Sequence, residues 1–175
     1  MSTMSATAIV KGNKKQTTDA NELLQLYLKK GASYDLITWV ILGGKKFMPK
    51  EPVSGFDFIT ASDKGIPKLS VMNLADVMNI PMKDMAAMLN LSYKTLGRKK
   101  STDTMDNLVS SLSIEIANTI AKGLSVFEDT IKFNHWLQKE NRALQGKKPF
   151  ELLNTPTGIR LVNRVLGRIE EGIYS

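Results

Sequence analysis

The spacing of apolar residues between positions 105 and 127 constrains the fold of this chain more than any other feature of its sequence. Apolar side chains recur there every three or four residues for more than twenty residues: Met105, Leu108, Val109, Leu112, Ile116, Ile120, Leu124 and Phe127. This period puts them on one face of an α-helix, whereas a half-buried strand would alternate at every second residue. We therefore expect a long helix that forms the spine of an all-α fold.

Shorter segments before this helix have the same periodicity. Residues 21–30 form an amphipathic segment that ends at Gly31, whereas the apolar run 34–42 fits either a strand or a helix. The predicted apolar face of the first segment consists of Leu23, Leu24, Tyr27 and Leu28. Further helices are expected over 56–62, 68–78 and 81–89. Residues 1–18 are polar and aperiodic, and we expect them to form a flexible arm.

Composition removes several classes of function. The chain has no cysteine, which excludes disulfides, thiolate zinc sites and cysteine nucleophiles, and its single histidine, His135, argues against histidine metal clusters and Ser/His/Asp catalysis. Gly43-Gly44-Lys45 lacks the GxxxxGK(S/T) spacing of a phosphate-binding loop. No apolar run reaches the roughly 20 residues that span a bilayer, and the N-terminus lacks the apolar core of a secretory signal. We expect a cytoplasmic protein that is not an enzyme, uses no cofactor or metal and has no membrane partner.

The positive charge is distributed unevenly along the chain. The net charge is +7, of which residues 1–62 carry +3, residues 63–102 carry +4 and residues 103–175 carry none. A basic N-terminal half indicates a polyanionic partner such as DNA, although a solvated lysine surface would give the same count.

Residues 81–99 have the pattern of a helix-turn-helix. Pro81 suits the first helical position, and Ala86 offers a small side chain where the two helices cross. Asn90 occupies the turn position that needs a left-handed backbone, which asparagine tolerates best after glycine. Ser92 is a good N-cap for the second helix, with Leu91 and Leu96 facing inward.

The second helix would then present its outer face to the major groove of DNA, with two lysines beyond it against phosphates. Gly97 within this helix costs about 1 kcal/mol relative to alanine, and a structural helical hairpin without DNA contact would show the same spacing. The candidate DNA-binding residues are Ser92, Tyr93, Lys94, Thr95, Arg98, Lys99 and Lys100.

The C-terminal block carries a more specific pattern. In order it contains Trp136-Leu137, Asn141, Ala143-Leu144, Gly146, Pro149, Leu152-Leu153, Thr155, Gly158, Val162, Leu166-Gly167-Arg168-Ile169 and Gly172-Ile173-Tyr174-Ser175. This order resembles the toxin-binding domain of the Xre/MbcA/ParS antitoxins, and the helix-turn-helix segment resembles the other half of those proteins. The chain departs from the family pattern at Gln145 and Asn90, where glycine is more usual.

The resemblance implies an all-helical, dimeric antitoxin of a type II toxin–antitoxin system. Such a protein binds its cognate toxin, most often a RES-type toxin that consumes NAD, and represses its own operon by binding operator DNA. The alternative is a stand-alone regulator whose C-terminal block only dimerises. The expected organisation is an arm (1–18), an Xre-like helix-turn-helix domain (19–102), a connecting helix (103–128) that contributes to a homodimer, and a toxin-binding domain (129–175).

The last helix combines an apolar stripe with a basic face. Thr155 caps it, Pro156 begins it and Gly172 ends it. Arg160, Arg164 and Arg168 recur every four residues and suit an acidic partner, although such a ladder can also be a solvated face. Ile173 and Tyr174 either cover the toxin's substrate pocket or fold back onto the core. The candidate toxin-binding residues are Asn141, Arg142, Lys147, Arg160, Arg164, Arg168, Gly172, Ile173, Tyr174 and Ser175.

Overall fold

The computed structural model describes residues 22–173, which are helical apart from their connecting loops and one isolated bridge between Pro67 and Thr104. The arm expected at 1–18 lies outside the described residues. After a helix over 22–29 the elements are α2 (Tyr34–Ile41), η1 (Gly44–Lys46), α3 (Gly55–Lys64), α4 (Lys68–Val77), α5 (Met82–Met88), α6 (Tyr93–Arg98), α7 (Asn107–Phe127), α8 (Thr130–Gln138), η2 (Arg142–Leu144), η3 (Pro149–Leu152) and α9 (Pro156–Glu170). None of these helices is both long and apolar enough to cross a membrane.

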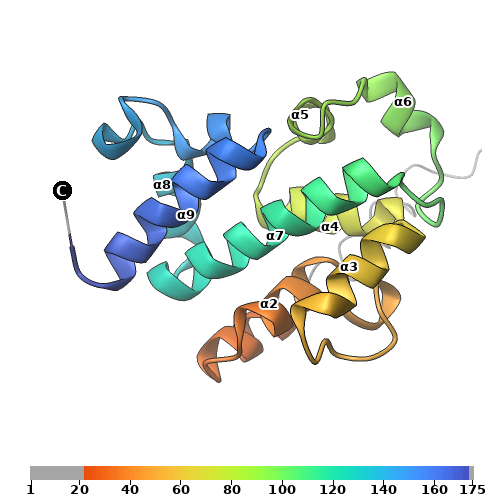
Figure 1. Ribbon diagram of the computed structural model, residues 1–175, viewed down its shortest axis with the longest axis horizontal. Helices are drawn as coiled ribbons and strands as arrows, with labels where there is room; N and C mark the ends of the chain where they lie inside the picture. Colours follow the sequence, from red (N-terminus) through yellow and green to blue (C-terminus); the bar gives the residue numbers. More distant parts are fainter. Residues whose placement is uncertain (1–21, 174–175) are drawn as a thin grey trace, which may run out of the picture.

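Helix α7 forms the centre of the fold, as its periodicity predicts. It packs against α2, α3, α4, α8 and α9, with α3 toward its N-terminal end and α8 and α9 toward its C-terminal end (Figure 1). Ile116, Ile120 and Leu124 are fully buried. The expected stripe fails at Leu108, whose side chain is 81% exposed. Most of the stripe is therefore buried by packing within the chain, and Leu108 at its N-terminal end stays open to solvent.

The apolar run at 34–42 is a helix, α2, and not a strand. The Ser33 side chain accepts a hydrogen bond from the Leu36 amide at its N-terminus. Five consecutive residues, from Ile37 to Ile41, are buried, so they point in several directions around the helix. A helix covered on several sides loses the periodicity that distinguishes it from a buried strand, which is why the sequence pattern left both possibilities open.

The first helix differs from its prediction in one side chain. Leu24 is buried and Tyr27 and Leu28 pack against the core, whereas Leu23 is exposed. The four apolar residues spread around more than one face of the helix, and only one of these faces packs against the rest of the chain.

The C-terminal elements are held to α7 by close backbone packing. A Cβ on Gly123 would lie 2.0 Å from the Phe133 ring, so α8 can approach α7 only because position 123 has no side chain. The rings of Phe127 and Trp136 lie 5.5 Å apart beside Phe133. Trp136 therefore belongs to an aromatic cluster at the end of α7.

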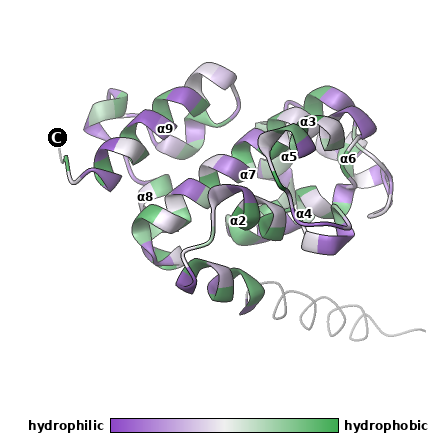
Figure 2. Ribbon diagram, turned by 60° about the horizontal axis from the view of Figure 1, so that its bottom comes forward, coloured by the Kyte–Doolittle hydropathy of each residue, from purple (hydrophilic) through white to green (hydrophobic). Residues whose placement is uncertain are grey.

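Helix α9 begins and ends as its sequence predicts. The Thr155 side chain accepts a hydrogen bond from the Gly158 amide at 3.1 Å, Pro156 is the first helical residue, and Gly172 is left-handed with φ 73°. Val162 and Leu166 are fully buried on its inner face. Hydrophilic and hydrophobic residues alternate along α9, as expected for a helix with one solvent-exposed face (Figure 2).

Candidate DNA-binding and partner-binding surfaces

Helices α5 and α6 pack against each other around a tight turn. Asn90, with φ 56°, is left-handed as its position predicts. Met85 and Ala86 of α5 are fully buried, and Leu96 is the one buried residue of α6. The predicted helix-turn-helix is therefore compatible with the local backbone and with the burial of its inward-facing residues.

The expected DNA-binding residues on α6 fall into two groups. The Ser92 hydroxyl accepts a hydrogen bond from the Thr95 amide at 3.0 Å and lies 2.7 Å from the Thr95 hydroxyl, so these two side chains satisfy each other at the N-cap. Tyr93 is 59% exposed, and Lys94 and Arg98 are exposed without an acidic partner in the described part of the chain. These three side chains are free to meet a ligand.

The two lysines that follow α6 differ from each other. The Lys99 ammonium donates to the Thr104 carbonyl at 2.8 Å, whereas the Lys100 side chain is exposed. The Lys99 carbonyl in turn accepts a hydrogen bond from the Lys68 ammonium at 2.7 Å. Lys99 thus holds the loop after α6 in place, a structural role that the charge pattern alone did not reveal.

The outer face of α9 carries the three expected arginines. Arg160 and Arg164 are exposed and Arg168 is half-buried. The Arg160 guanidinium donates to the Thr157 hydroxyl at 2.9 Å. Within residues 22–173 the one ion pair joins Lys122 to Glu170, so none of the three guanidinium groups is neutralised by a carboxylate of this region.

The loop before η3 holds the other expected partner-binding residues. The Asn141 side chain accepts a hydrogen bond from the Ala143 amide at 2.9 Å and caps η2, which packs against α9. Arg142 and Lys147 are exposed on this loop. Gln145 is left-handed with φ 56°, the conformation that glycine adopts most easily.

The C-terminal tip is described as far as Ile173; Tyr174 and Ser175 lie outside the described residues. The Ile173 amide donates to the Arg168 carbonyl at 2.8 Å and the Gly172 amide to the Ile169 carbonyl at 3.0 Å. The Ile173 side chain is 49% exposed. The tip therefore turns back over the end of α9 beside Arg168, with half of its isoleucine still open to solvent.

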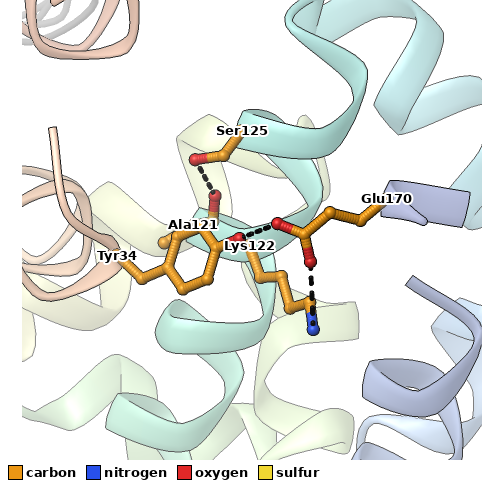
Figure 3. A network of polar contacts seen from close by, with 5 residues as sticks. All are labelled: Tyr34, Ala121, Lys122, Ser125 and Glu170. Carbon is orange, nitrogen blue, oxygen red and sulfur yellow. Dashed lines mark hydrogen bonds and ion pairs between the residues drawn. The ribbon is translucent and has the colours of Figure 1, made fainter. Parts of the chain in front are cut away.

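Several polar contacts join the halves of the chain and were not foreseen, among them one at Glu170 and one at Asn90. Figure 3 shows Glu170 at the end of α9 accepting a hydrogen bond from the Tyr34 hydroxyl of α2 and pairing with the Lys122 ammonium of α7 at 3.7 Å. The hydrogen bond to the Glu170 carboxylate, reinforced by burial, raises the pKa of Tyr34 to about 12. Tyr34 and Glu170 are 136 positions apart, and no local pattern connects them.

The second contact involves the turn of the predicted helix-turn-helix. The Asn90 amide group donates to the carbonyl of Asn154, in the loop before α9, at 3.3 Å. The residue that the turn needs for its backbone thus also bonds to the C-terminal elements.

Metal chemistry has no support in the described region. Among residues 22–173 no group of three or more His, Cys, Asp or Glu side chains could hold a metal ion.

A family model matches the C-terminal part of the chain, from the end of α7 through α8, η2 and η3 to α9. Residues 122–172 match the Antitoxin Xre/MbcA/ParS C-terminal toxin-binding domain. No curated protein matches the chain. The matched segment contains Arg160, Arg164 and Arg168 and every C-terminal feature described above up to Gly172. Residues 122–172 of this chain are therefore similar to the C-terminal toxin-binding domain of the Xre/MbcA/ParS antitoxins.

Proposed function

We propose that this chain is a cytoplasmic antitoxin of a type II toxin–antitoxin system. In this proposal it binds a RES-type, NAD-consuming toxin through α9 and represses its own operon through α6. The observation that carries the proposal is the basic face of α9 within the matched segment. Three arginines there have no acidic partner among the described residues, and guanidinium groups bind carboxylates in a bidentate geometry that suits an acidic protein surface.

Inhibition would occur by occlusion. Arg164 and Arg168 would meet acidic residues that line the toxin's substrate pocket, while the tip at 172–175 excludes NAD. The half-exposed Ile173 beside Arg168 supports this arrangement. The arginine can pair with acidic groups at the rim of a pocket while the neighbouring isoleucine fills the pocket itself. No distortion of the toxin is needed.

Co-expression with a RES-type toxin tests the proposal. We expect the full chain to restore growth and to copurify with the toxin. Deleting residues 172–175 should leave a folded protein that still binds the toxin but no longer prevents NAD consumption. If the truncated protein neutralises as well as the full chain, the tip has no inhibitory part. If the full chain neither binds nor neutralises the toxin, the alternative of a stand-alone regulator is favoured.

Repression would require two copies of the chain. One helix-turn-helix reads half of a two-fold operator, so two copies must lie about one DNA turn apart. The face of α7 expected to join them is buried within the monomer, but another apolar surface is open. Phe56 (78% exposed) and Ile59 share one face of α3, and Asn107, next to the exposed Leu108, donates to Asp63 at 2.9 Å, which brings the two helices together.

We assign this α3–α7 surface to the second copy. Phe56→Asp with Leu108→Asp should give a monomer by light scattering, with weak operator binding and intact toxin binding. Ile131→Asp, an equally exposed apolar position on α8, is the control and should stay dimeric. A monomeric parent chain, both free and bound to DNA, would contradict the dimer.

A further inference from the structure

Helix α6, the helix proposed to read the operator, has few contacts that fix its direction. It has six residues, and Leu96 is its one buried side chain. Its N-terminal cap is local, because it runs from the Ser92 hydroxyl to Thr95 within the same turn. One buried side chain holds a short helix against the protein but leaves it free to tilt about that contact. A second point of attachment is therefore needed to set the angle of α6.

Lys68, the first residue of α4, supplies this second point. Its half-buried ammonium donates to the Lys99 carbonyl at 2.7 Å, and Lys99 is the C-cap residue of α6. The carbonyls at the end of a helix have no partner within the helix and carry the negative end of its dipole, so a lysine ammonium is a favourable partner for them. The Lys68 side chain thus caps α6 from another helix.

The backbone at Lys68 is itself fixed. Pro67 forms a bridge with Thr104, and the Lys68 amide donates to the Asp103 carbonyl at 2.9 Å. Further along α4, Leu74 is fully buried. The side chain that caps α6 therefore starts from a helix anchored in the core, and it holds the end of α6 at a defined place relative to that core.

We propose that Lys68 is a positioning residue for operator recognition, which sets the angle of α6 without touching DNA; this inference rests on the proposed function of α6. Side chains that read bases must be held within about 0.5 Å of their places, and Lys94 and Arg98 both lie on α6. Loss of the bond to Lys99 therefore weakens the contacts of both. Lys68 counts toward the positive charge of residues 63–102, but its ammonium is used within the chain.

A positioning role and a phosphate contact predict different responses to salt. Each phosphate that a cation neutralises adds about 0.9 to the slope of log affinity against log salt concentration. Lys68 neutralises no phosphate in this proposal, so its loss lowers operator affinity and leaves the slope unchanged. Its loss also lowers the discrimination between operator and unrelated DNA, because base contacts carry the sequence information and phosphate contacts do not.

The first test uses the full chain without DNA. Lys68→Met keeps most of the length of the side chain and removes the ammonium. Amide hydrogen exchange at residues 96–100 should become about tenfold faster, while exchange in α9 stays the same. Lys68→Arg, which retains an N–H donor, should restore slow exchange. Equal exchange in the parent chain and in Lys68→Met would overturn the proposal, because the bond would then not hold α6.

The second test measures DNA binding by the same variants. The probe is a duplex from upstream of this chain's own reading frame, and a shuffled duplex of equal length and composition serves as unrelated DNA. Lys68→Met should bind the probe about tenfold more weakly, with the salt slope of the parent chain and unchanged binding to the shuffled duplex. Lys68→Arg should recover the affinity.

Two further lysine variants serve as controls. Lys100→Met, at the exposed lysine expected against phosphates, should lower the salt slope by about one. Lys64→Met removes an equal charge from an exposed position at the end of α3 and should bind the probe as the parent chain does.

The outcomes separate this inference from the proposed function of α6. A lower salt slope in Lys68→Met would make Lys68 a phosphate contact and overturn the positioning role. Equal losses in Lys64→Met and Lys68→Met would assign the effect to charge and overturn it as well. A parent chain that binds the probe and the shuffled duplex equally contradicts operator recognition, and the positioning role falls with it. The capping of α6 by Lys68 would still stand on the exchange measurement.

Discussion

Helices α6 and α9 are both proposed to bind a partner, but they are held in the fold by different means. Helix α9 has fifteen residues and buries a continuous face that includes Ile159, Val162 and Leu166. Helix α6 has six residues and buries only Leu96. A helix of six residues is too short to be stable alone. Its position therefore depends on the elements around it, whereas α9 is positioned by its own apolar face.

The loop after α6 shows how this dependence works. The first amides of α4 have no partner within their own helix, and the Lys68 and Leu69 amides donate to the Asp103 and Ser101 carbonyls instead. The Lys68 ammonium adds a bond to the Lys99 carbonyl. The comparison teaches that the surface of α9 can be altered with little effect on its placement, while α6 is sensitive to residues outside it.

The largest expected effect comes from a substitution that disrupts the packing of α9 and leaves α6 unchanged. A Cβ on Gly158 would lie 1.9 Å from the Leu152 carbonyl oxygen, a backbone atom that cannot easily move. Gly158→Ala should lower the free energy of unfolding by about 3 kcal/mol and impair toxin binding before DNA binding, as measured by urea denaturation and pull-down.

The matched control lies on the same helix. A Cβ on Gly167 would meet only the mobile end of the Lys122 side chain at 3.4 Å. Gly167→Ala should leave stability unchanged or raise it by up to about 1 kcal/mol. Equal losses in the two variants would show that helix propensity, and not the contact with Leu152, sets the effect.

The second prediction changes the surface of α9 without changing its placement. Arg164→Glu with Arg168→Glu should raise the dissociation constant for the toxin about 100-fold, because attraction to acidic groups becomes repulsion. The circular dichroism spectrum and operator binding should not change. Unchanged neutralisation in the growth assay would mean that the arginine ladder is a solvated face.

The third prediction addresses α6. Lys94→Ala with Arg98→Ala should weaken operator binding by about 2 kcal/mol, or about thirtyfold in a gel shift, and should reduce its dependence on salt. Toxin neutralisation should persist. A double variant that binds its promoter with the parent affinity and salt dependence would show that α6 is not the recognition helix.

The smallest effect tests the contact between α2 and α9. Tyr34→Phe should lower stability by about 1 kcal/mol at neutral pH, a modest value because the pair is largely exposed. In the parent chain the folded pKa of Tyr34 is about 12, above its unfolded value of 10.0. The tyrosine's contribution is therefore complete below pH 10 and lost as the pH rises toward 12. Denaturation at pH 8 and pH 11 should show this loss in the parent chain and not in the variant.

Sequence periodicity predicts most of this fold because most helices bury one face. It predicts α4, α7 and α9 and the left-handed turn at Asn90. It could not distinguish helix from strand at 34–42, where burial extends around α2, and it placed Leu108 in a stripe that its position in the first turn of α7 leaves exposed. A stripe alone does not say how far a packing face extends.

The candidate sites divide in the same way. The exposed positions of Lys94, Arg98, Arg160 and Arg164 follow from helical spacing, which is a local property. Glu170 and Tyr34 come together only through the tertiary fold, and a separation of 136 positions contains no signal for a single sequence.

The hydrogen bond from Asn90 to Asn154 has a consequence for recombining such proteins. A glycine at position 90 would adopt the left-handed turn with less strain, yet it would leave the Asn154 carbonyl without this donor. A chimera that joins the DNA-binding half of another protein to residues 122–172 of this chain would therefore lose a contact across the new junction, even if each half folds correctly. Position 90 and the loop at 154 should be transferred together, as a matched pair, when operator specificity is exchanged between chains.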